Sequence, residues 1–320
     1  MRVDRRARRT TTGAIDLTTA VGSVELANPV LTASGTSGHG AELAPYLDLS
    51  SLGAVVVKSL SPDAWAGNPA PRVHETSGSM LNSVGLQGPG VAAWLTDDLP
   101  RLQATGARVV ASIWGRSVAD FERAALLMAD APSEVIAVEI NLSCPNVEAK
   151  SDIFAHSVAA TEDAVAATVG CRRPRWAKLS PNVTDVIPIA DAAHRAGAEA
   201  VTLINTVMAM AIDPDTRRYR LGNGGGGLSG PAIHPISVRI VHDVHTALPA
   251  LPIVGVGGVV DADTAVELLM AGASAVQVGT ATFADPRAPA SVLAGLVDWC
   301  GRHRVRGVAE LIGGVHGQRV

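Results

Sequence analysis

Short runs rich in Val, Ile and Ala recur along the chain, separated by segments whose apolar residues repeat at helical spacing. The runs fall at residues 28–35, 53–59, 107–115, 135–143, 175–181, 198–206, 251–258 and 273–280. A continuous apolar run of this length is typical of a strand buried on both faces, as in a parallel sheet covered by helices. Eight alternating strand–helix units in one chain predict an α/β fold, the (β/α)8 TIM barrel.

The segments between the runs carry signals of helix ends. Residues 117–130 have helical periodicity, with Ser117 placed to act as the N-cap, and residues 184–198 and 261–273 each close on a glycine. A doubly wound sheet is the alternative fold. It is disfavoured because "ASGTSGHG", after the first run, does not fit the G-x-G-x-x-G fingerprint.

Two connections are longer than the usual strand-to-helix loop of a barrel, at residues 59–100 and 206–230. Long structured loops of a barrel usually lie on its catalytic face, so we expect both beside the active site. No repeat or linker divides the chain. We therefore expect residues 1–12 to form a flexible basic tail and residues 13–320 a single barrel domain.

Composition narrows the class of protein. Hydrophobic residues make up 47% of the chain, which argues against disorder, and aromatic residues 3%, which argues against a base-stacking surface for nucleic acid. No apolar run is long enough for a membrane span, and no apolar segment of a secretory signal follows the arginines of residues 1–10. Cys144, Cys171 and Cys300 form no zinc or cluster pattern. We expect no metal, no membrane and a reducing compartment, the cytoplasm.

Polar residues and glycines collect where the apolar runs end, which in a barrel is the side of the active site. Lys58 and Lys178 each end such a run. Burying an ammonium group alone is costly, so each needs an anionic partner. A salt bridge within the protein would satisfy one lysine, whereas two at one mouth favour an anionic ligand. The residues at the strand ends are Ser34, Gly35, Lys58, Ser59, Ser112, Asn141, Cys144, Lys178, Asn205, Thr206, Gly257, Gly258, Gly279 and Thr280.

Three glycine-rich segments fall where barrels commonly bind phosphate, around the loops after the seventh and eighth strands. They are "GGGGLSGPA" (224–232), "VGVGGV" (254–259) and "VQVGTATF" (276–283). Glycines let backbone N–H groups come close to an anion. The segments together indicate a phosphorylated cofactor or a phosphorylated substrate.

A cysteine and several asparagines supply the remaining candidate chemistry. Cys144, in "EINLSCPNVE" (139–148), could act as a general base if neighbouring lysines or a helix N-terminus favour its thiolate. Amide side chains that could bind a planar, amide-like ligand are Asn82, Asn141, Asn146 and Asn205. Paired carboxylates are missing, which argues against a glycosidase.

In this order, these motifs resemble the dihydroorotate dehydrogenase family, and within it the class 1B catalytic subunit. The resemblance covers nearly the whole chain, in "NPVLTASGT", "GNPAPRVHET", "MLNSVGLQGPG", "EINLSCPNV", "KLSPNVTD", "LINTVMAMAID", "GGLSGPA", "GVGGV" and "GASAVQVGTATF". It implies one FMN on an α/β barrel and the oxidation of dihydroorotate to orotate in pyrimidine (UMP) synthesis.

The resemblance also implies roles for single residues. Cys144 would remove the C5 proton while the C6 hydride passes to the flavin, and Lys178 would stabilise negative charge on the reduced flavin. The implied substrate residues are Lys58, Asn82, Ser83, Val84, Gly85, Leu86, Asn141, Asn205 and Thr206. The implied FMN residues are Ser34, Lys58, Ser59, Ser112, Asn141, Lys178, Ile204, Gly230, Gly257, Gly258, Gly279 and Thr280.

The chain departs from the family pattern in two places. Ser112 stands where the family usually has an Asn, so one FMN hydrogen bond would be weakened or replaced. The loop at residues 147–161 differs from the family's basic, glycine-rich loop, which puts its behaviour as a lid in doubt. The arginines of residues 1–10 have no assigned counterpart.

The family implies a partner but leaves alternatives open. Class 1B enzymes pass electrons to NAD⁺ through a second subunit with FAD and a 2Fe–2S cluster, around a homodimer core of a heterotetramer. Rival predictions are a class 1A enzyme that uses fumarate and an FMN-dependent dihydropyrimidine dehydrogenase. A flavin module without catalysis, and a barrel isomerase or aldolase, leave Cys144 and the amides unused.

Overall fold

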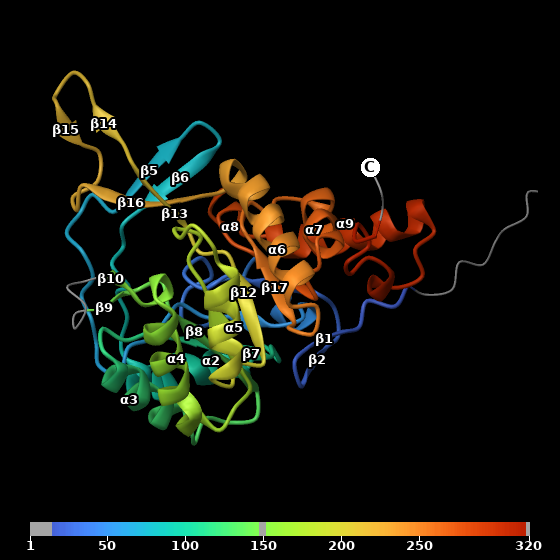
Figure 1. The fold of residues 1–320 in the computed structure, drawn as a ribbon, viewed down its shortest axis with the longest axis horizontal. Coiled ribbons are helices and arrows are strands. Elements are labelled where there is room, and N and C mark those ends of the chain that lie inside the picture. The colour runs from blue at the N-terminus through green and yellow to red at the C-terminus, as the bar shows by residue number, and fades with distance from the viewer. Residues whose placement is uncertain (1–14, 147–151, 318–320) are drawn as a thin grey trace, which may run out of the picture.

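The eight apolar runs form a closed barrel in the computed structural model, which describes residues 15–146 and 152–317. Eight parallel strands follow the order β3-β18-β17-β12-β11-β8-β7-β4, and a parallel bridge between Leu31 and Ala54 joins the two end strands (Figure 1). The predicted (β/α)8 TIM barrel is confirmed. The barrel strands are β3 (Val30–Thr32), β4 (Val55–Val56), β7 (Val109–Ile113), β8 (Val135–Asn141), β11 (Arg175–Lys178), β12 (Ala200–Leu203), β17 (Ile253–Val256) and β18 (Ala275–Val278).

The helices surround this barrel, and three were located from the sequence. Helix α3 begins where predicted, since Ser117 Oγ accepts a hydrogen bond from the Asp120 N–H at 3.2 Å. The helices are α1 (Val91–Ala93), α2 (Leu99–Gln103), α3 (Val118–Met128), α4 (Val158–Ala167), α5 (Ile187–Arg195), α6 (His234–Ala247), α7 (Ala262–Met270), α8 (Ala281–Ala284) and α9 (Ala288–His303). The 3-10 helices are η1 (Leu49–Ser51), η3 (Phe154–His156), η4 (Thr168–Cys171), η5 (Pro231–Ile233) and η6 (Val308–Glu310), and η2 (Trp94–Asp98) is a π-helix. Within the described residues, none of these helices combines the length and apolar character needed to cross a bilayer.

The two long connections pair with each other over one end of the barrel. They form a second sheet in the order β13-β16-β6-β5, from which the β14–β15 hairpin projects (Figure 1). The strands are β5 (Val73–Thr76), β6 (Ser79–Asn82), β13 (Val207–Met210), β14 (Ile212–Asp213), β15 (Arg218–Tyr219) and β16 (Gly225–Ser229). Two further strand pairs are β1 (Thr19–Val21) with β2 (Val24–Leu26) and β9 (Pro145–Asn146) with β10 (Asp152–Ile153).

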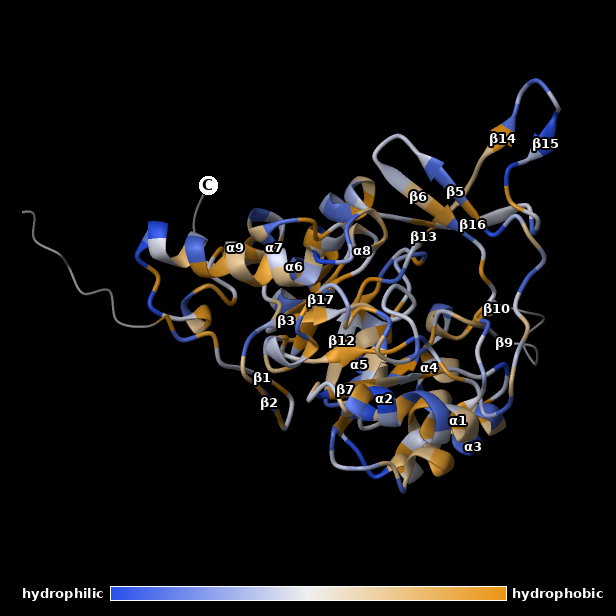
Figure 2. Ribbon diagram, turned by 180° about the vertical axis from the view of Figure 1, so that it is seen from behind, coloured by the Kyte–Doolittle hydropathy of each residue, from blue (hydrophilic) through white to orange (hydrophobic). Residues whose placement is uncertain are grey.

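The barrel interior changes from apolar to polar along the strands. Side chains alternate between the two faces of a strand, so Ala137, Glu139 and Asn141 of β8 share one face. Ala137 belongs to an apolar cluster that includes Trp176 and is capped by Val21 and other residues of the β1–β2 hairpin. Figure 2 shows the apolar strands at the centre of the molecule. Chemistry is therefore confined to the opposite, carboxyl end.

Two sequence expectations lie wholly or partly outside the described residues. These are the basic tail at residues 1–12 and, within the altered loop, residues 147–151. The assignment of residues 13–320 to one domain stays a prediction.

Candidate active site

A cavity of about 920 Å³ opens at the carboxyl ends of the barrel strands, between the strands and the second sheet. It collects every predicted substrate and FMN residue except Ser112. These are Ser34, Lys58, Ser59, Asn82, Ser83, Val84, Gly85, Leu86, Asn141, Lys178, Ile204, Asn205, Thr206, Gly230, Gly257, Gly258, Gly279 and Thr280. Residues from both long connections thus share one site with the strand ends. Their individual roles in binding stay predictions.

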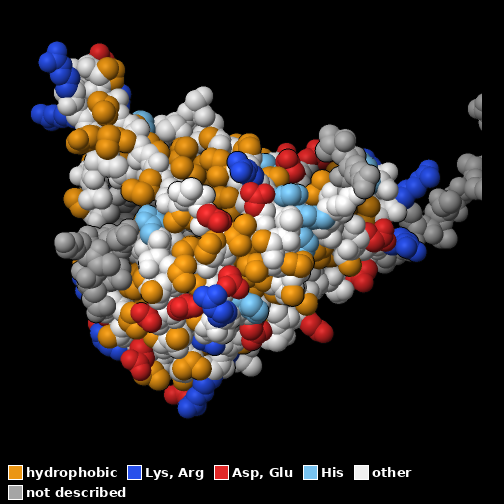
Figure 3. Space-filling model, in the orientation of Figure 1, with side chains coloured by type: hydrophobic (Ala, Val, Ile, Leu, Met, Phe, Trp, Pro, Cys, Tyr) orange, Lys and Arg blue, Asp and Glu red, His pale blue; other side chains and the backbone are white. Residues whose placement is uncertain are grey.

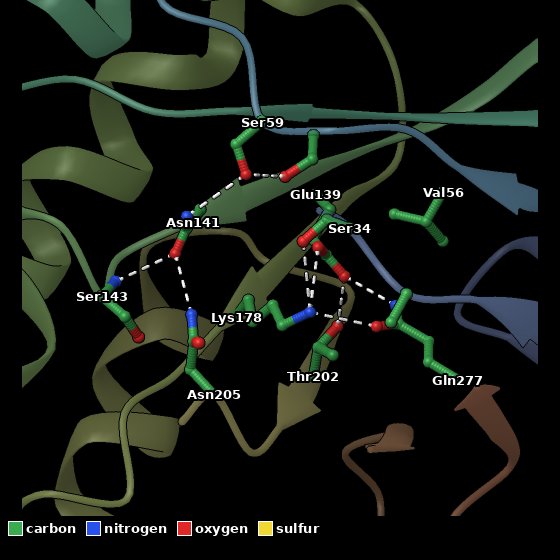
Figure 4. A network of polar contacts seen from close by, with 12 residues as sticks. Ser34, Val56, Ser59, Glu139, Asn141, Ser143, Lys178, Thr202, Asn205 and Gln277 are labelled. Carbon is green, nitrogen blue, oxygen red and sulfur yellow. Dashed lines mark hydrogen bonds and ion pairs between the residues drawn. The ribbon is translucent and has the colours of Figure 1, made fainter. Parts of the chain in front are cut away.

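Lys178 lies at the floor of this cavity, where it is 4% exposed. Its Nζ is 3.5 Å from Glu139 Oε1 and donates hydrogen bonds to Gln277 Oε1 at 3.1 Å and Ser34 Oγ at 3.3 Å (Figure 4). A salt bridge therefore satisfies one of the two strand-end lysines, as the sequence allowed.

Lys58 is the other lysine, and its charge is not balanced in the same way. No ion pair within the described residues includes it. Burial, together with the nearby charge of Lys178, lowers the pKa of Lys58 to about 8. An ammonium group held at this cost favours an anionic ligand in the cavity.

The pH dependence of anion binding should reveal the charge of Lys58, with orotate, the anion that the sequence resemblance implies, as the probe. Lys58 is charged below its pKa of about 8 and neutral above it. We expect the affinity for orotate to be high at neutral pH and to fall as the pH rises above about 8. Because a bound anion raises the pKa of Lys58, the fall should level off only above that raised pKa. Calorimetric titrations across this range would measure it. Lys58→Met should give weak binding without this step, and an unchanged step in that variant would contradict the role of Lys58.

A chain of polar side chains connects the ends of three strands, β12, β8 and β4, beside the lysines. Asn205 Nδ2 donates to Asn141 Oδ1 at 3.2 Å, and Asn141 Nδ2 donates to Ser59 Oγ at 3.2 Å (Figure 4). Ser112 lies behind this chain, fully buried, with its Oγ 2.8 Å from Ser59 Oγ. Ser112 does not line the cavity. The structure gives Ser112 a contact with Ser59, and its place among the FMN residues stays a prediction.

Cys144, the predicted base, is beside the cavity but turned away from it. Its thiol is fully buried and donates to the backbone oxygens of Gly115 at 3.0 Å and Asn141 at 3.2 Å. Burial raises the pKa of the Cys144 thiol to about 12. The neighbouring Ser143 and Ile153 line the cavity, whereas Cys144 does not. In this arrangement the thiol keeps its proton and is hydrogen-bonded away from the cavity, so its role as a base stays a prediction.

Glycines shape the far end of the cavity, where a phosphate group was predicted. Gly230, Gly257 and Gly258 have φ angles of 103°, 133° and 71°, which favour glycine. A Cβ on Gly258 would lie 2.6 Å from His234 Cβ, so only glycine lets these segments approach. Thr280 Oγ1 donates to Ser229 Oγ at 2.8 Å between the same segments. The glycines thus bring the backbone of these segments close together at this end of the cavity.

The sequence did not single out several residues of the site. Trp65, Trp114 and Arg116 line the cavity, and the Arg116 guanidinium lies 4.4 Å from the centroid of the Trp65 ring. Trp65 Nε1 donates to the Gly85 backbone oxygen at 3.0 Å, which fixes the segment that carries the predicted substrate residues. Glu139 was also missed, although a carboxylate within the run "VIAVEIN" calls for a buried cation.

Fold and site define the class of protein: a (β/α)8 barrel whose cavity brings glycine-rich segments, lysines and amides together at one mouth, with a buried cysteine beside it. A family model for dihydroorotate dehydrogenase matches residues 16–299. The chain therefore belongs to the dihydroorotate dehydrogenase family, and it is an oxidoreductase acting on a CH–CH bond. The resemblance seen in the sequence is confirmed.

Curated relatives narrow this further, and they share the name dihydroorotate dehydrogenase B (NAD(+)), catalytic subunit. The protein from Desulforudis audaxviator is 48% identical over 303 residues, which cover 93% of this chain and 96% of the relative. Those from Alkaliphilus oremlandii and Geotalea daltonii are each 45% identical, over 92% and 93% of this chain and 96% and 97% of their own lengths. The enzymes of this family are flavin-dependent.

Proposed function

We propose that this chain is an FMN-binding catalytic subunit that oxidises dihydroorotate to orotate in pyrimidine synthesis. The observation that carries the proposal is the cavity, in which the predicted cofactor and substrate residues meet although they come from every part of the barrel. Relatives that match almost the whole chain carry the corresponding name.

The residues present fit FMN. Gly230, Gly257 and Gly258 give the phosphate a close backbone approach, and Lys178 with Ser34 offers donors to the ring system. When bound, the flavin supplies the acceptor for the hydride that leaves C6 of the substrate. Lys178 then contributes positive charge on the floor of the cavity, where negative charge develops.

The substrate end of the cavity is lined by amides and by Lys58. The Asn82, Asn141 and Asn205 side chains can orient the planar ring through its amide groups, and Lys58 can pair with its carboxylate. Cys144 accepts the C5 proton once its thiol has left the Gly115 and Asn141 carbonyl groups and lost its own proton.

The electron acceptor is proposed to be NAD⁺, reached through a partner subunit that carries FAD and a 2Fe–2S cluster. The word "subunit" in the relatives' name supports a partner. A homodimer core of a heterotetramer is part of the proposal, and apolar side chains exposed around the projecting hairpin offer a surface for one of its contacts (Figure 3). They are Met208, Met210, Ile212 and Tyr219. The free thiols of Cys144, Cys171 and Cys300 support a cytoplasmic site of action.

The test is an anaerobic absorbance trace of the purified chain mixed with dihydroorotate. We expect a yellow protein whose flavin band bleaches, since the first half-reaction requires no partner. Reoxidation by fumarate but not by NAD⁺ plus the partner would move the protein to the class 1A alternative. A yellow protein that does not bleach with dihydroorotate would overturn the proposed substrate.

A further inference from the structure

Glu139 is a fully buried carboxylate at the centre of the barrel, one layer below the cavity. It faces the barrel interior because it alternates with Ala137 and Asn141 along β8. It does not line the cavity, so it is not a ligand-binding residue. A buried carboxylate is costly, and it is retained only where cations or hydrogen-bond donors surround it.

The polar contacts of the Glu139 carboxylate within the described residues are all with hydrogen-bond donors or a cation. Oε2 accepts hydrogen bonds from Gln277 Nε2 at 2.7 Å and Thr202 Oγ1 at 3.1 Å. Oε1 accepts no hydrogen bond within the described residues and faces Lys178 Nζ at 3.5 Å. Donors on one oxygen and a cation at the other match an ionised carboxylate. Figure 4 shows the Lys178 ammonium group directed at Glu139 and Gln277.

Gln277 connects the two charged groups into one unit. Its Oε1 accepts from Lys178 Nζ at 3.1 Å while its Nε2 donates to Glu139. Lys178, Glu139 and Gln277 belong to three strands, β11, β8 and β18, so the strands of the barrel fix their relative positions. The ammonium group of Lys178 therefore has a defined place on the floor of the cavity before any ligand binds.

We propose that Glu139 is a positioning residue that anchors Lys178 and partly neutralises its charge, and so lowers the reduction potential of the bound flavin. This inference rests on the proposed FMN site. With Glu139 the charge of Lys178 is partly compensated, so the reduced flavin gains less stabilisation than an unpaired ammonium group would give it. Without the carboxylate the same site carries one more positive charge, which favours the anionic reduced cofactor.

The experiment is the midpoint potential of the flavin in the FMN-loaded full chain, by dye equilibration. Glu139→Gln keeps the shape and removes the charge. We expect a more positive potential, with at least about a tenfold higher ratio of reduced to oxidised flavin at a fixed dye potential, or about 30 mV for a two-electron couple. Glu162→Gln, which removes a carboxylate from the exposed pair with Arg195, is the matched control and should leave the potential unchanged.

Thr202→Val covers the case in which Glu139→Gln does not fold. It removes one donor from Glu139 and leaves the carboxylate less compensated, so the potential should move in the opposite, negative direction. A folded Glu139→Gln variant at the wild-type potential would overturn the proposal while leaving the FMN site intact. If only Thr202→Val folds, no shift or a positive shift overturns it. A wild-type chain that binds no FMN overturns this inference together with the proposed function.

Discussion

Replacing Cys144 with alanine is expected to slow reduction of the bound flavin by dihydroorotate roughly 10²–10⁴-fold, the usual cost of losing a general base. FMN should remain bound, because Cys144 does not line the cavity in this structure. Rapid mixing under anaerobic conditions, with a single turnover recorded at the flavin band, would measure the rate. A rate equal to that of the wild type would remove Cys144 from the mechanism.

The matched control for this variant is Cys171→Ala, which removes a buried thiol from η4, outside the cavity lining. Its flavin should be reduced at the wild-type rate. The pH dependence adds a second check. Because burial raises the pKa of the Cys144 thiol to about 12, the thiolate fraction grows about tenfold with each pH unit below that value. At saturating dihydroorotate, the wild-type rate should therefore rise with pH, and the small residual rate of Cys144→Ala should not.

Replacing Lys178 with alanine is expected to lower both the free energy of unfolding and the retention of FMN. The change leaves Glu139 Oε1 without its cation in the barrel interior. Breaking a buried ion pair from one side typically costs about 3–5 kcal/mol, so the free energy of unfolding should fall by that order. Denaturation in urea would measure it, and the retention of FMN on gel filtration should fall as well.

The double variant Lys178→Met/Glu139→Gln separates the ion pair from the packing. It removes both charges, so most of the stability lost in Lys178→Ala should return, while FMN retention should stay low. A double variant as unstable as Lys178→Ala would show that the loss arises from packing and not from an uncompensated carboxylate.

Hydrophobic patterning located the barrel because buried parallel strands have a simple signature. The run at 135–143 became β8, Val135–Asn141, and Ser117 capped its helix as its side-chain chemistry requires. Helix α5 is shorter than the predicted 184–198 span: it begins at Ile187 and ends at Arg195. A proline in its first turn marks where the helix begins, and hydrophobic periodicity alone does not contain that signal.

The site was predictable only as a set of strand ends. The register of the parallel strands determines which residues reach the mouth of the barrel. It brings Lys58 and Lys178 to one cavity. Side-chain direction after the strand is set by tertiary contacts, so the sequence could not show that the Cys144 thiol is turned toward Gly115. Nor could the sequence show the pairing of Lys178 with Glu139, since these residues lie on different strands, β11 and β8, that become neighbours only in the folded barrel.

The sheet over the cavity has a consequence for the order in which the molecule forms. Neighbouring barrel strands are mostly consecutive in the chain, whereas β6 pairs with β16 across a separation of 145 residues between Asn82 and Gly227. Contacts of such long range are formed late, because the closure of a long loop must precede them. On the ribosome, the first half of the chain would thus carry its substrate segment without the strand that holds it. That segment would be held only after β16 emerges and pairs, and the cavity would be complete only after β17 and β18 follow.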